Sequence, residues 1–376
     1  AISAAAPSTS RRHQPTGKGA RRPASLDGIV GGQTGQPVPG KQGRMKPLEE
    51  ILRNAARSDK TIVLSEGTDP RVVQAAVAAR KQGIARIILV CDTEADDAQL
   101  ALAGEVDGLD IHRPAVSPLT KELAELYHSI RKHKGVDADQ ALQQALTPHI
   151  YAALLVKAGH ADGCIGGAVL SSAEIIKTAI QVIGVAEGTK LVSSFFLFLF
   201  CEDHHARKGP CIFSDAGLVV DPTAEELCEI ALASARSFED LTNEAARIAM
   251  LSFSTRGSAE HHAVSKVQRA TMLAREAAPD LLIDGELQFD AAFVPEVAQS
   301  KAADSPIEGN ANVFIFPNLD AGNIGYKIAQ RIGGAKAIGP ILQGLSHPAN
   351  DLSRGCSSED ILHMIAVTTA QSIHKD

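Results

Sequence analysis

The sequence has no CxxC pair, no long apolar run and no excess of basic residues. Six cysteines are scattered through 376 residues without regular spacing, which argues against a disulfide framework and favours a reducing compartment. The net charge of −7 provides no basic field for nucleic acid or anionic lipid. The longest strongly apolar run, 195–200, is far shorter than the ~20 residues that a membrane-spanning helix needs. We therefore expect a cytoplasmic protein that acts on small molecules, with no nucleic-acid and no membrane partner.

The sequence does contain enough apolar material for a large core. Apolar residues make up 44% and charged residues 22%, as in ordinary globular proteins, and the length of 376 residues suits two domains. Residues 1–44 differ, because they are rich in basic residues, Gly, Pro and Ser and contain a single acid. We predict that this segment is disordered, as an added leader or a start extended upstream of Met45. An organellar transit peptide is the third alternative, disfavoured because several prolines break any amphipathic helix.

Apolar periodicity alternates between helix and strand from residue 46 onward. It predicts a helix over 46–58, a strand over 61–65, a helix over 69–82 and a strand over 86–91. Further strands are predicted at 162–166, 247–252, 281–284 and 312–316. The repeated alternation is typical of βαβ units, so we expect an α/β fold. In such sheets the loops at the carboxyl ends of the strands build the site.

Two strand exits contain residues that suit an anion or a polar substrate. At 166–172, the backbone N–H groups with Ser171 and Ser172 suit an anion at a helix N-terminus, and a simple serine cap fits equally. At 284–290, three acids could orient a substrate or bind a cation. Because no histidine or repeated spacing accompanies these acids, a loop that meets the other domain is the better interpretation.

The segment 252–258 has the same character as 166–172, with an added guanidinium. Ser254 and Thr255 stand beside Arg256, whose fixed fork of donors matches phosphate oxygens. A capped helix start is the alternative, and it stays open.

The segment 318–327 leaves the strand at 312–316 and opens a helix. Its glycines would let a ligand approach the backbone, while Asp320, Asn323 and Lys327 offer donors and acceptors. Turn chemistry explains Asp and Asn equally well.

The sharpest constellation lies near the C-terminus. Ser353 and Arg354 precede Gly355, so a hydroxyl, a guanidinium and a flexible backbone stand together at the entrance of an apolar helix. This combination predicts a cradle for a tetrahedral anion. Asp360, just inside the helix, also has the spacing of a capping-box acid paired with Ser357.

Histidine and cysteine near residue 201 do not indicate a metal site. Cys201-Glu-Asp-His204-His205 matches no common zinc spacing, and adjacent histidines point in different directions on any regular element. We expect a solvated hairpin loop there and no bound metal.

Several long motifs, in the right order, resemble those of phosphate acetyltransferases. They are Met250-Leu-Ser-Phe-Ser-Thr-Arg-Gly-Ser258, Asp284-Gly-Glu-Leu-Gln-Phe-Asp290, Asn318-Leu-Asp-Ala-Gly-Asn-Ile-Gly-Tyr-Lys327, Gly344-Leu345 and Asn350-Asp-Leu-Ser-Arg-Gly-Cys-Ser357. The resemblance covers the chain from about Met45 to the C-terminus. It is similar above all to the short, single-module enzymes, including the ethanolamine-utilisation type.

The resemblance implies two α/β lobes of isocitrate-dehydrogenase-like architecture with an interlobe active-site cleft. The first domain would comprise 45–187 plus 340–376, and the second, 188–339, would be inserted into it. Members of the family are typically homodimers joined through the inserted domain, so the resemblance implies a homodimer here. Its reaction converts acetyl-CoA and phosphate reversibly into acetyl phosphate and CoA, with no permanently bound cofactor.

The resemblance also assigns roles to residues. Arg354 would bind the phosphoryl group, Ser353 would hydrogen-bond the tetrahedral intermediate, and Asp360 would take the proton of the CoA thiol. Arg131 matches a family arginine of the CoA or phosphate site. Lys177 stands where many members have arginine, which keeps the charge but loses the bidentate fork. The residues expected to bind phosphate or CoA are Arg131, Lys177, Ser171, Ser172, Ser254, Thr255, Arg256, Asp320, Asn323, Lys327, Asn350 and Gly355.

Asp360 stays open between a base and a helix cap. An acid in the first helical turn has its charged form stabilised, which makes it a weaker base. Cys356 suggests a covalent intermediate, but packing or lining of the pocket is the better interpretation, so we expect direct attack by the CoA thiolate.

Three other functions remain as alternatives. A phosphate butyryl- or propionyltransferase would differ only in pocket residues that the motifs do not reveal. A nicotinamide-dependent dehydrogenase lacks its GxGxxG fingerprint here. A non-catalytic regulatory module would be expected to lose the Ser-Arg-Gly motif, which is intact.

Overall fold

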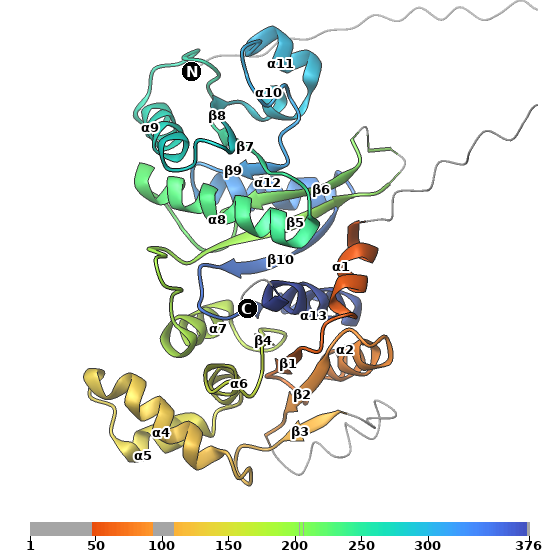
Figure 1. Ribbon diagram of the computed structural model, residues 1–376, viewed down its shortest axis with the longest axis vertical. Coiled ribbons are helices and arrows are strands. Elements are labelled where there is room, and N and C mark those ends of the chain that lie inside the picture. Colours follow the sequence, from red (N-terminus) through yellow and green to blue (C-terminus); the bar gives the residue numbers. More distant parts are fainter. Residues whose placement is uncertain (1–46, 93–108, 203, 206, 374–376) are drawn as a thin grey trace, which may run out of the picture. The chain divides into compact units, whose positions relative to one another are not determined.

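The computed structural model describes residues 47–92, 109–202, 204–205 and 207–373. The segment 1–44, predicted to be disordered, lies outside the described residues. The described chain forms two β-sheets, each flanked by helices, which confirms the predicted α/β fold (Figure 1).

The first sheet has five parallel strands in the order β11-β4-β1-β2-β3. The strands are β11 (Ala349–Asp351), β4 (Gly163–Gly166), β1 (Thr61–Leu64), β2 (Arg86–Val90) and β3 (Asp110–His112). The predicted strands at 61–65, 86–91 and 162–166 are therefore confirmed as β1, β2 and β4.

Helices cover both faces of the first sheet. Successive residues of β1 point to opposite faces, as in any strand, so Ile62 and Leu64 pack with α2 and α13 while Val63 packs with α6. The helices around this sheet are α1 (Pro47–Ala55), α2 (Pro70–Lys81), α4 (Thr120–Arg131), the 3₁₀ turn η1 (Lys132–Lys134), α5 (Ala138–Ala145), α6 (Pro148–Lys157), α7 (Ser172–Thr178), the π-helical turn η2 (Ala179–Ile183) and α13 (Ser358–Ile373).

The second sheet has six strands in the order β10-β5-β6-β9-β7-β8. The strands are β10 (Lys336–Gln343), β5 (Ser193–Phe200), β6 (Gly209–Ser214), β9 (Val313–Ile315), β7 (Arg247–Leu251) and β8 (Leu282–Leu287). β5 runs antiparallel to both β6 and β10, and the other pairs are parallel. The antiparallel β5–β6 pair confirms the predicted hairpin around residues 201–205.

The helices of the second sheet also lie on both of its faces. They are α8 (Ala224–Thr242), α9 (His262–Ala277), α10 (Phe289–Phe293), α11 (Pro295–Lys301) and α12 (Leu319–Arg331). α8 and α9 share one core with the strands, while α10 and α12 cover a phenylalanine-rich core on the other face. β10 extends to Gln343, past the predicted domain boundary at 340, and the division into two domains stays a prediction.

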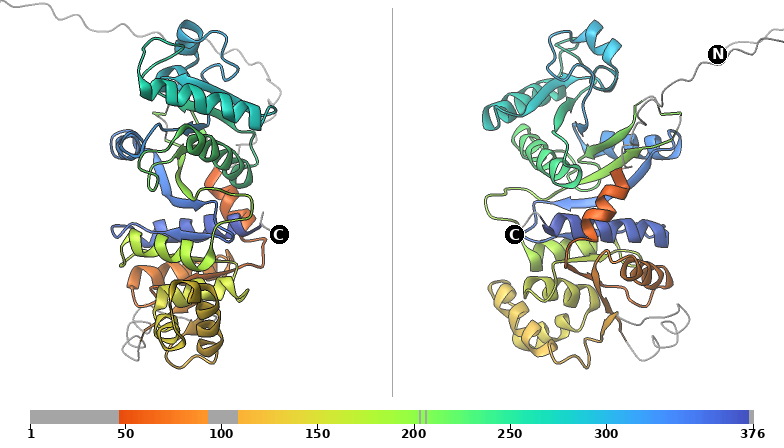
Figure 2. Two further views of the ribbon diagram at one scale, coloured as in Figure 1. Left: turned by 90° about the vertical axis from the view of Figure 1, so that its left-hand side faces the viewer. Right: turned by 45° about the vertical axis from the view of Figure 1, so that its right-hand side comes forward.

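The two sheets meet around α13. This helix lies between β10 of the second sheet and β4 of the first, which Figures 1 and 2 show from different directions. None of the described helices combines the length and the apolar character that crossing a membrane would demand.

Candidate active site

Three loops leave neighbouring strands at the carboxyl edge of the first sheet. They are 65–69 after β1, 167–171 after β4 and 352–357 after β11. The N–H of Leu352 donates to the carbonyl of Gly166 at 2.7 Å, so the last two loops start side by side. The parallel order β11-β4-β1 therefore brings together segments that are far apart in the sequence.

The loop after β11 contains a tight turn. The N–H of Cys356 donates to the carbonyl of Ser353 at 2.9 Å, which closes the turn. Ser353, Arg354 and Gly355 are exposed, whereas Cys356 is buried. The Arg354 guanidinium makes no hydrogen bond or ion pair with any residue that the structure describes. Its five N–H donors are therefore available to an anion.

This turn forms one wall of a cavity of about 270 Å³. On one side, helix α13 and the loop that follows β11 contribute Leu352, Ser353, Gly355, Cys356, Asp360 and Met364. On the other side, α12, β5 and β10 of the second sheet contribute Phe196, Tyr326, Lys327, Gln330, Arg331, Ala337, Ile338, Gly339 and Pro340. The cavity thus has a hydroxyl and a carboxylate on one side and two cationic side chains on the other.

The wall from the second sheet is ordered by aromatic contacts. The rings of Phe196 and Tyr326 stack with their centroids 3.9 Å apart and their planes 17° apart. Lys327 Nζ lies 4.6 Å from the centroid of the Tyr326 ring and donates to Asn323 Oδ1. These contacts hold the ammonium group at the cavity without neutralising its charge.

Asp360 has both of the positions that the sequence predicts for it. The N–H and the hydroxyl of Ser357 donate to Asp360 Oδ2 at 2.9 and 2.8 Å, and the N–H of Asp360 lies 3.2 Å from Ser357 Oγ. This is a reciprocal capping box at the start of α13, so the helix-cap interpretation is confirmed. Asp360 also lines the cavity, and its Oδ1 has no hydrogen bond to a described residue. The second carboxylate oxygen, Oδ1, is therefore available to accept a proton.

Cys356 lines the same cavity but is poorly suited to be a nucleophile. Burial raises the pKa of its thiol, and the nearby positive charge of Arg71 opposes this only in part. Because the thiolate is the reactive form, a raised pKa makes it scarcer. The geometry therefore favours the packing role.

The family model described as phosphate acetyl/butaryl transferase matches residues 47–369. The chain belongs to this family. A phosphate acetyltransferase of Acetivibrio thermocellus is 46% identical over 330 residues, which cover 87% of this chain and 98% of the relative. The match therefore spans almost the whole length of this short relative.

Solved structures of the family agree with the fold. A phosphotransacetylase from Streptococcus pyogenes matches with a TM-score of 0.82 and 40% identity, over 87% of this chain and 98% of that chain. EutD phosphotransacetylase from Staphylococcus aureus matches with a TM-score of 0.79 and 38% identity, over 86% and 99%. The predicted resemblance to phosphate acetyltransferases, including the ethanolamine-utilisation type, is confirmed.

In this family member the loop after β4 binds an anion from its own chain. The N–H groups of Ala168, Val169 and Leu170 donate to the buried Glu66 carboxylate at 2.6, 3.0 and 2.8 Å. The prediction that these N–H groups receive a ligand anion is therefore wrong, because Glu66 already occupies them. Glu66 carries no sequence signal of this role, since it lies about 100 residues before the loop.

Ser171 and Ser172 open helix α7. Ser171 is its N-cap, in a capping box with Glu174 whose hydroxyl–carboxylate distance is 2.7 Å. Lys177 is exposed in the last turn of α7, and Arg131 ends α4 with a buried Nε that has no partner among the described residues. These four side chains lie outside the cavity lining, and their contacts with CoA or phosphate stay predictions.

Ser254, Thr255 and Arg256 lie after β7 and are occupied by their own chain. Arg256 donates to both oxygens of the buried Asp284 at 3.0 and 2.9 Å, and Ser254 Oγ donates to Glu286 at 2.9 Å. Thr255 Oγ1 accepts the N–H of Gln288. The structure does not bring this loop to the cavity that Ser353 lines.

Two of the three acids of 284–290 form ion pairs with cations of the chain itself. Asp284 is paired with Arg275 as well as Arg256, and Asp290 with Lys301 at 2.8 Å. Within the described ranges, no group of three or more His, Cys, Asp or Glu side chains is placed to hold a metal ion.

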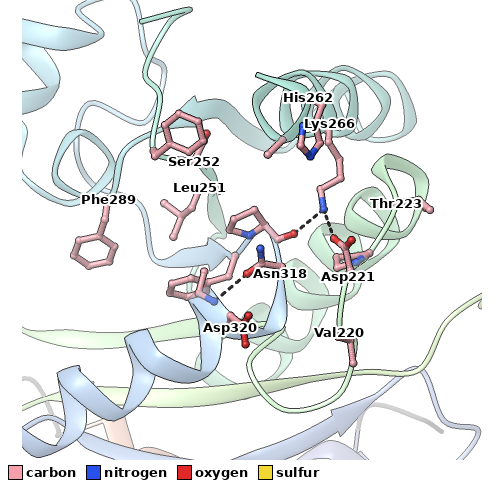
Figure 3. A pocket seen from close by; sticks show the side chains of 16 residues that line it. Val220, Asp221, Thr223, Leu251, Ser252, His262, Lys266, Phe289, Asn318 and Asp320 are labelled. Carbon is pink, nitrogen blue, oxygen red and sulfur yellow. Dashed lines mark hydrogen bonds and ion pairs between the residues drawn. The ribbon is translucent and has the colours of Figure 1, made fainter. Parts of the chain in front are cut away.

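Asp320 lines a second, larger cavity of about 870 Å³ (Figure 3). In this cavity Lys266 Nζ contacts Asp221 Oδ1 at 2.8 Å and the carbonyl of Pro317 at 3.0 Å. Asn318 accepts the N–H of Ala321 as the N-cap of α12. Asp320 therefore lies apart from Lys327, which lines the other cavity from the same helix.

Gly322 and Asn350, which were predicted to serve a ligand, are both engaged in contacts within the protein. Gly322 lies inside α12, where an added Cβ would come within 2.3 Å of the Asp215 carbonyl, so the close approach is made by the protein's own backbone. Asn350 is fully buried, accepts the N–H of Leu342, and donates to Thr368 and Gln371. No donor of its side chain is left over for a substrate.

The predicted residues that meet at the smaller cavity are Ser353, Gly355, Asp360 and Lys327. Sequence reasoning missed Phe196, Tyr326, Gln330 and Arg331. Arg331 had a usable signal, because it follows Lys327 by one helical turn and so shares its face. Phe196 had none, since it is one of several phenylalanines in β5.

Proposed function

We propose that this chain is a phosphate acetyltransferase, which reversibly converts acetyl-CoA and phosphate into acetyl phosphate and CoA. The observation that carries the proposal is the cavity that joins Ser353 and Asp360 to Lys327 and Arg331. It combines a hydroxyl, a base and cations in a chain that is 46% identical to a phosphate acetyltransferase. CoA and acetyl-CoA are substrates in this proposal, and no cofactor is permanently bound.

The chemical step is direct attack of the CoA thiolate on the acetyl carbonyl. A free thiol has a pKa near 8.5, so only a minor fraction is ionised at neutral pH and a positioned base accelerates the reaction. Asp360 Oδ1 takes the thiol proton, while Ser357 holds Oδ2 and fixes the orientation of the carboxylate. The S–C bond forms, a tetrahedral intermediate collapses, and the C–O bond to phosphate breaks.

Charge develops on two groups during this step. The carbonyl oxygen becomes an oxyanion, to which Ser353 Oγ donates a hydrogen bond. Phosphate leaves as an anion, paired with the Arg354 guanidinium, whose donors have no described protein partner. Lys327 and Arg331 add positive charge from the opposite wall.

CoA binding extends beyond the cavity in this proposal. The buried Nε of Arg131, without a described hydrogen-bond partner, is a donor that a CoA phosphate oxygen would satisfy. Lys177 provides a point charge where many relatives have an arginine fork, so we expect altered affinity for CoA or phosphate there.

The proposed architecture is that of two α/β lobes of isocitrate-dehydrogenase type with the site in the cleft between them. The strands of the second sheet come from residues 193–343, between β4 and β11 in the sequence, which supports an inserted domain. We further propose a homodimer joined through that domain and a cytoplasmic location, which suits six cysteines that form no disulfide in the part of the chain that the structure describes.

One coupled assay tests the function. Purified protein is mixed with CoA and either acetyl phosphate or butyryl phosphate, and loss of free thiol is followed. Rapid thiol loss with acetyl phosphate and slow loss with butyryl phosphate is the expected result. The reverse preference would indicate a phosphate butyryltransferase, and no thiol loss with either would refute the proposal.

A further inference from the structure

Arg71 donates hydrogen bonds to the turn 353–356 of the candidate active site. It lies at the start of α2, two residues after the N-cap Asp69. Its Nε and Nη2 donate to the two oxygens of Asp69 at 3.0 and 2.8 Å. This hydrogen-bonded pair lowers the pKa of Asp69 and raises that of Arg71. The orientation of the guanidinium is therefore set within the loop after β1.

The other guanidinium donors reach two different loops. Nη1 donates to the carbonyls of Arg354 and Cys356 at 2.8 and 3.0 Å, and Nη2 donates to the carbonyl of Ala168 at 2.9 Å. Two acceptors thus belong to the turn 353–356, and the third belongs to the loop after β4. Through one side chain, Arg71 joins the loops after β1, β4 and β11.

Arg71 differs from a substrate-binding arginine because all of its N–H donors are already used within the protein. A guanidinium has five N–H donors, and the five bonds to Asp69, Arg354, Cys356 and Ala168 use all of them. None remains for a phosphate oxygen. The guanidinium of Arg354 is the opposite case, with every donor free of described partners.

We propose that Arg71 is a positioning residue, which holds the turn 353–356 in the geometry that presents Ser353 and Arg354 to the substrate. The proposal rests on the proposed function, because it concerns the same turn. Glu66 supports it, since its carboxylate fixes the N–H groups of the loop after β4 while Arg71 fixes a carbonyl of that loop.

A positioning role predicts a particular kinetic signature. A displacement of reacting groups by about 1 Å can lower a rate about 100-fold. Loss of Arg71 would displace a group that acts in the transition state, so kcat and kcat/KM fall together. A side chain that only binds the phosphoryl group would instead show mainly a higher KM for acetyl phosphate.

The test uses the full chain and compares Arg71→Lys, Arg71→Ala and wild type in the thiol assay. We expect kcat to fall about 100-fold in Arg71→Ala and about 10-fold or more in Arg71→Lys, because lysine has no planar fork. If the wild type itself lacks activity, the proposed function fails, but the structural part of the proposal is still measurable by hydrogen exchange.

Hydrogen exchange provides that independent readout. Amide exchange in peptides covering 352–357 and 167–171 should accelerate in Arg71→Ala, with little change elsewhere. Unchanged exchange there, kcat within about twofold of wild type, or a higher KM for acetyl phosphate at unchanged kcat would each overturn the proposal.

Arg207 provides a matched control. Its guanidinium also holds a loop through backbone carbonyls, donating to Ala311 at 2.6 Å and Asn310 at 3.0 Å, but it does not line the cavity. Arg207→Lys should lower stability and leave kcat unchanged. An equal loss of kcat in Arg207→Lys would show that Arg71 acts only through general stability.

If Arg71→Ala does not fold, Asp69→Asn decides the question. Asparagine remains a good N-cap for α2, so the helix is preserved, while one acceptor of the guanidinium is replaced by a donor. A several-fold fall in kcat with faster exchange at 352–357 supports the proposal. Full kcat in folded Asp69→Asn overturns it.

Discussion

The substitution Asp360→Asn separates the two roles that the structure gives this residue. Asp360 caps α13 through Ser357 and also lines the cavity with a free carboxylate oxygen. Asparagine has almost the same shape and can still accept the N–H of Ser357, but it cannot accept a proton at neutral pH. The change therefore preserves most of the cap and removes the base.

The expected loss of stability is small. One negative charge in the first turn of a helix contributes about 0.3–1 kcal/mol. Weakening the hydrogen bonds from Ser357 at 2.9 and 2.8 Å adds about 1 kcal/mol, because bonds to a charged acceptor become neutral ones. We expect a total of about 1–2 kcal/mol in the free energy of unfolding, which leaves the protein folded.

The expected loss of activity is much larger. A positioned general base contributes about 100- to 10,000-fold to a rate, or about 3–5 kcal/mol of the activation free energy. Ser357→Ala is the matched variant, because it removes the cap hydroxyl and keeps the Asp360 carboxylate. It should cost about 1 kcal/mol of stability and less than about 10-fold in kcat.

Both variants are measured by thermal unfolding and by thiol consumption with acetyl phosphate and CoA. We expect the two variants to have similar stabilities and kcat values that differ at least about 10-fold. If Asp360→Asn keeps kcat within about threefold of Ser357→Ala, Asp360 is only a helix cap, and the base has to be sought elsewhere.

Three further substitutions test other parts of the site. Arg354→Gln should lose about 3 kcal/mol or more of transition-state stabilisation, and near-normal kcat/KM would refute its contact with phosphate. Cys356→Ala should keep its turnover, whereas a folded but fully inactive variant would indicate an acyl-enzyme. Burial raises the pKa of Asp351 to about 6, so the folded state binds a proton that the unfolded state releases, and stability falls as pH rises from about 4 to 6. Asp351→Asn should flatten this dependence and raise stability above pH 6 by up to about 3 kcal/mol, as denaturant titrations at several pH values would show.

Local sequence patterns determined the elements and several of their ends. The continuous apolar run Ile62-Val63-Leu64 is typical of a strand with helices on both faces, and these residues do pack into separate cores. Ser357 and Asp360 are three residues apart, which is the spacing of a capping box, and this spacing predicts the start of α13. Such features are predictable because their partners lie within one helical turn or along one strand.

Two of the glycine- and hydroxyl-rich loops that were predicted to bind a ligand are occupied by the chain's own side chains. Arg256 has the chemistry of a phosphate ligand, but Asp284, 28 residues away, occupies both sides of its fork. The N–H groups after β4 form an anion site, but Glu66 fills it. A motif shows which groups are available, and only the tertiary structure shows whether another part of the chain already uses them.

The sequence by itself determined the family and the α/β class, and it predicted the roles of Ser353, Arg354 and Asp360. Only the tertiary structure decided which residues face the turn 353–356 across the cavity. It also decided which arginine donates hydrogen bonds to the carbonyls of that turn. Arg71 bonds to carbonyls 283 and 285 residues away, because parallel strands bring their carboxyl ends to one edge whatever their order in the chain. Contacts of that kind depend on sheet order, which no local pattern encodes.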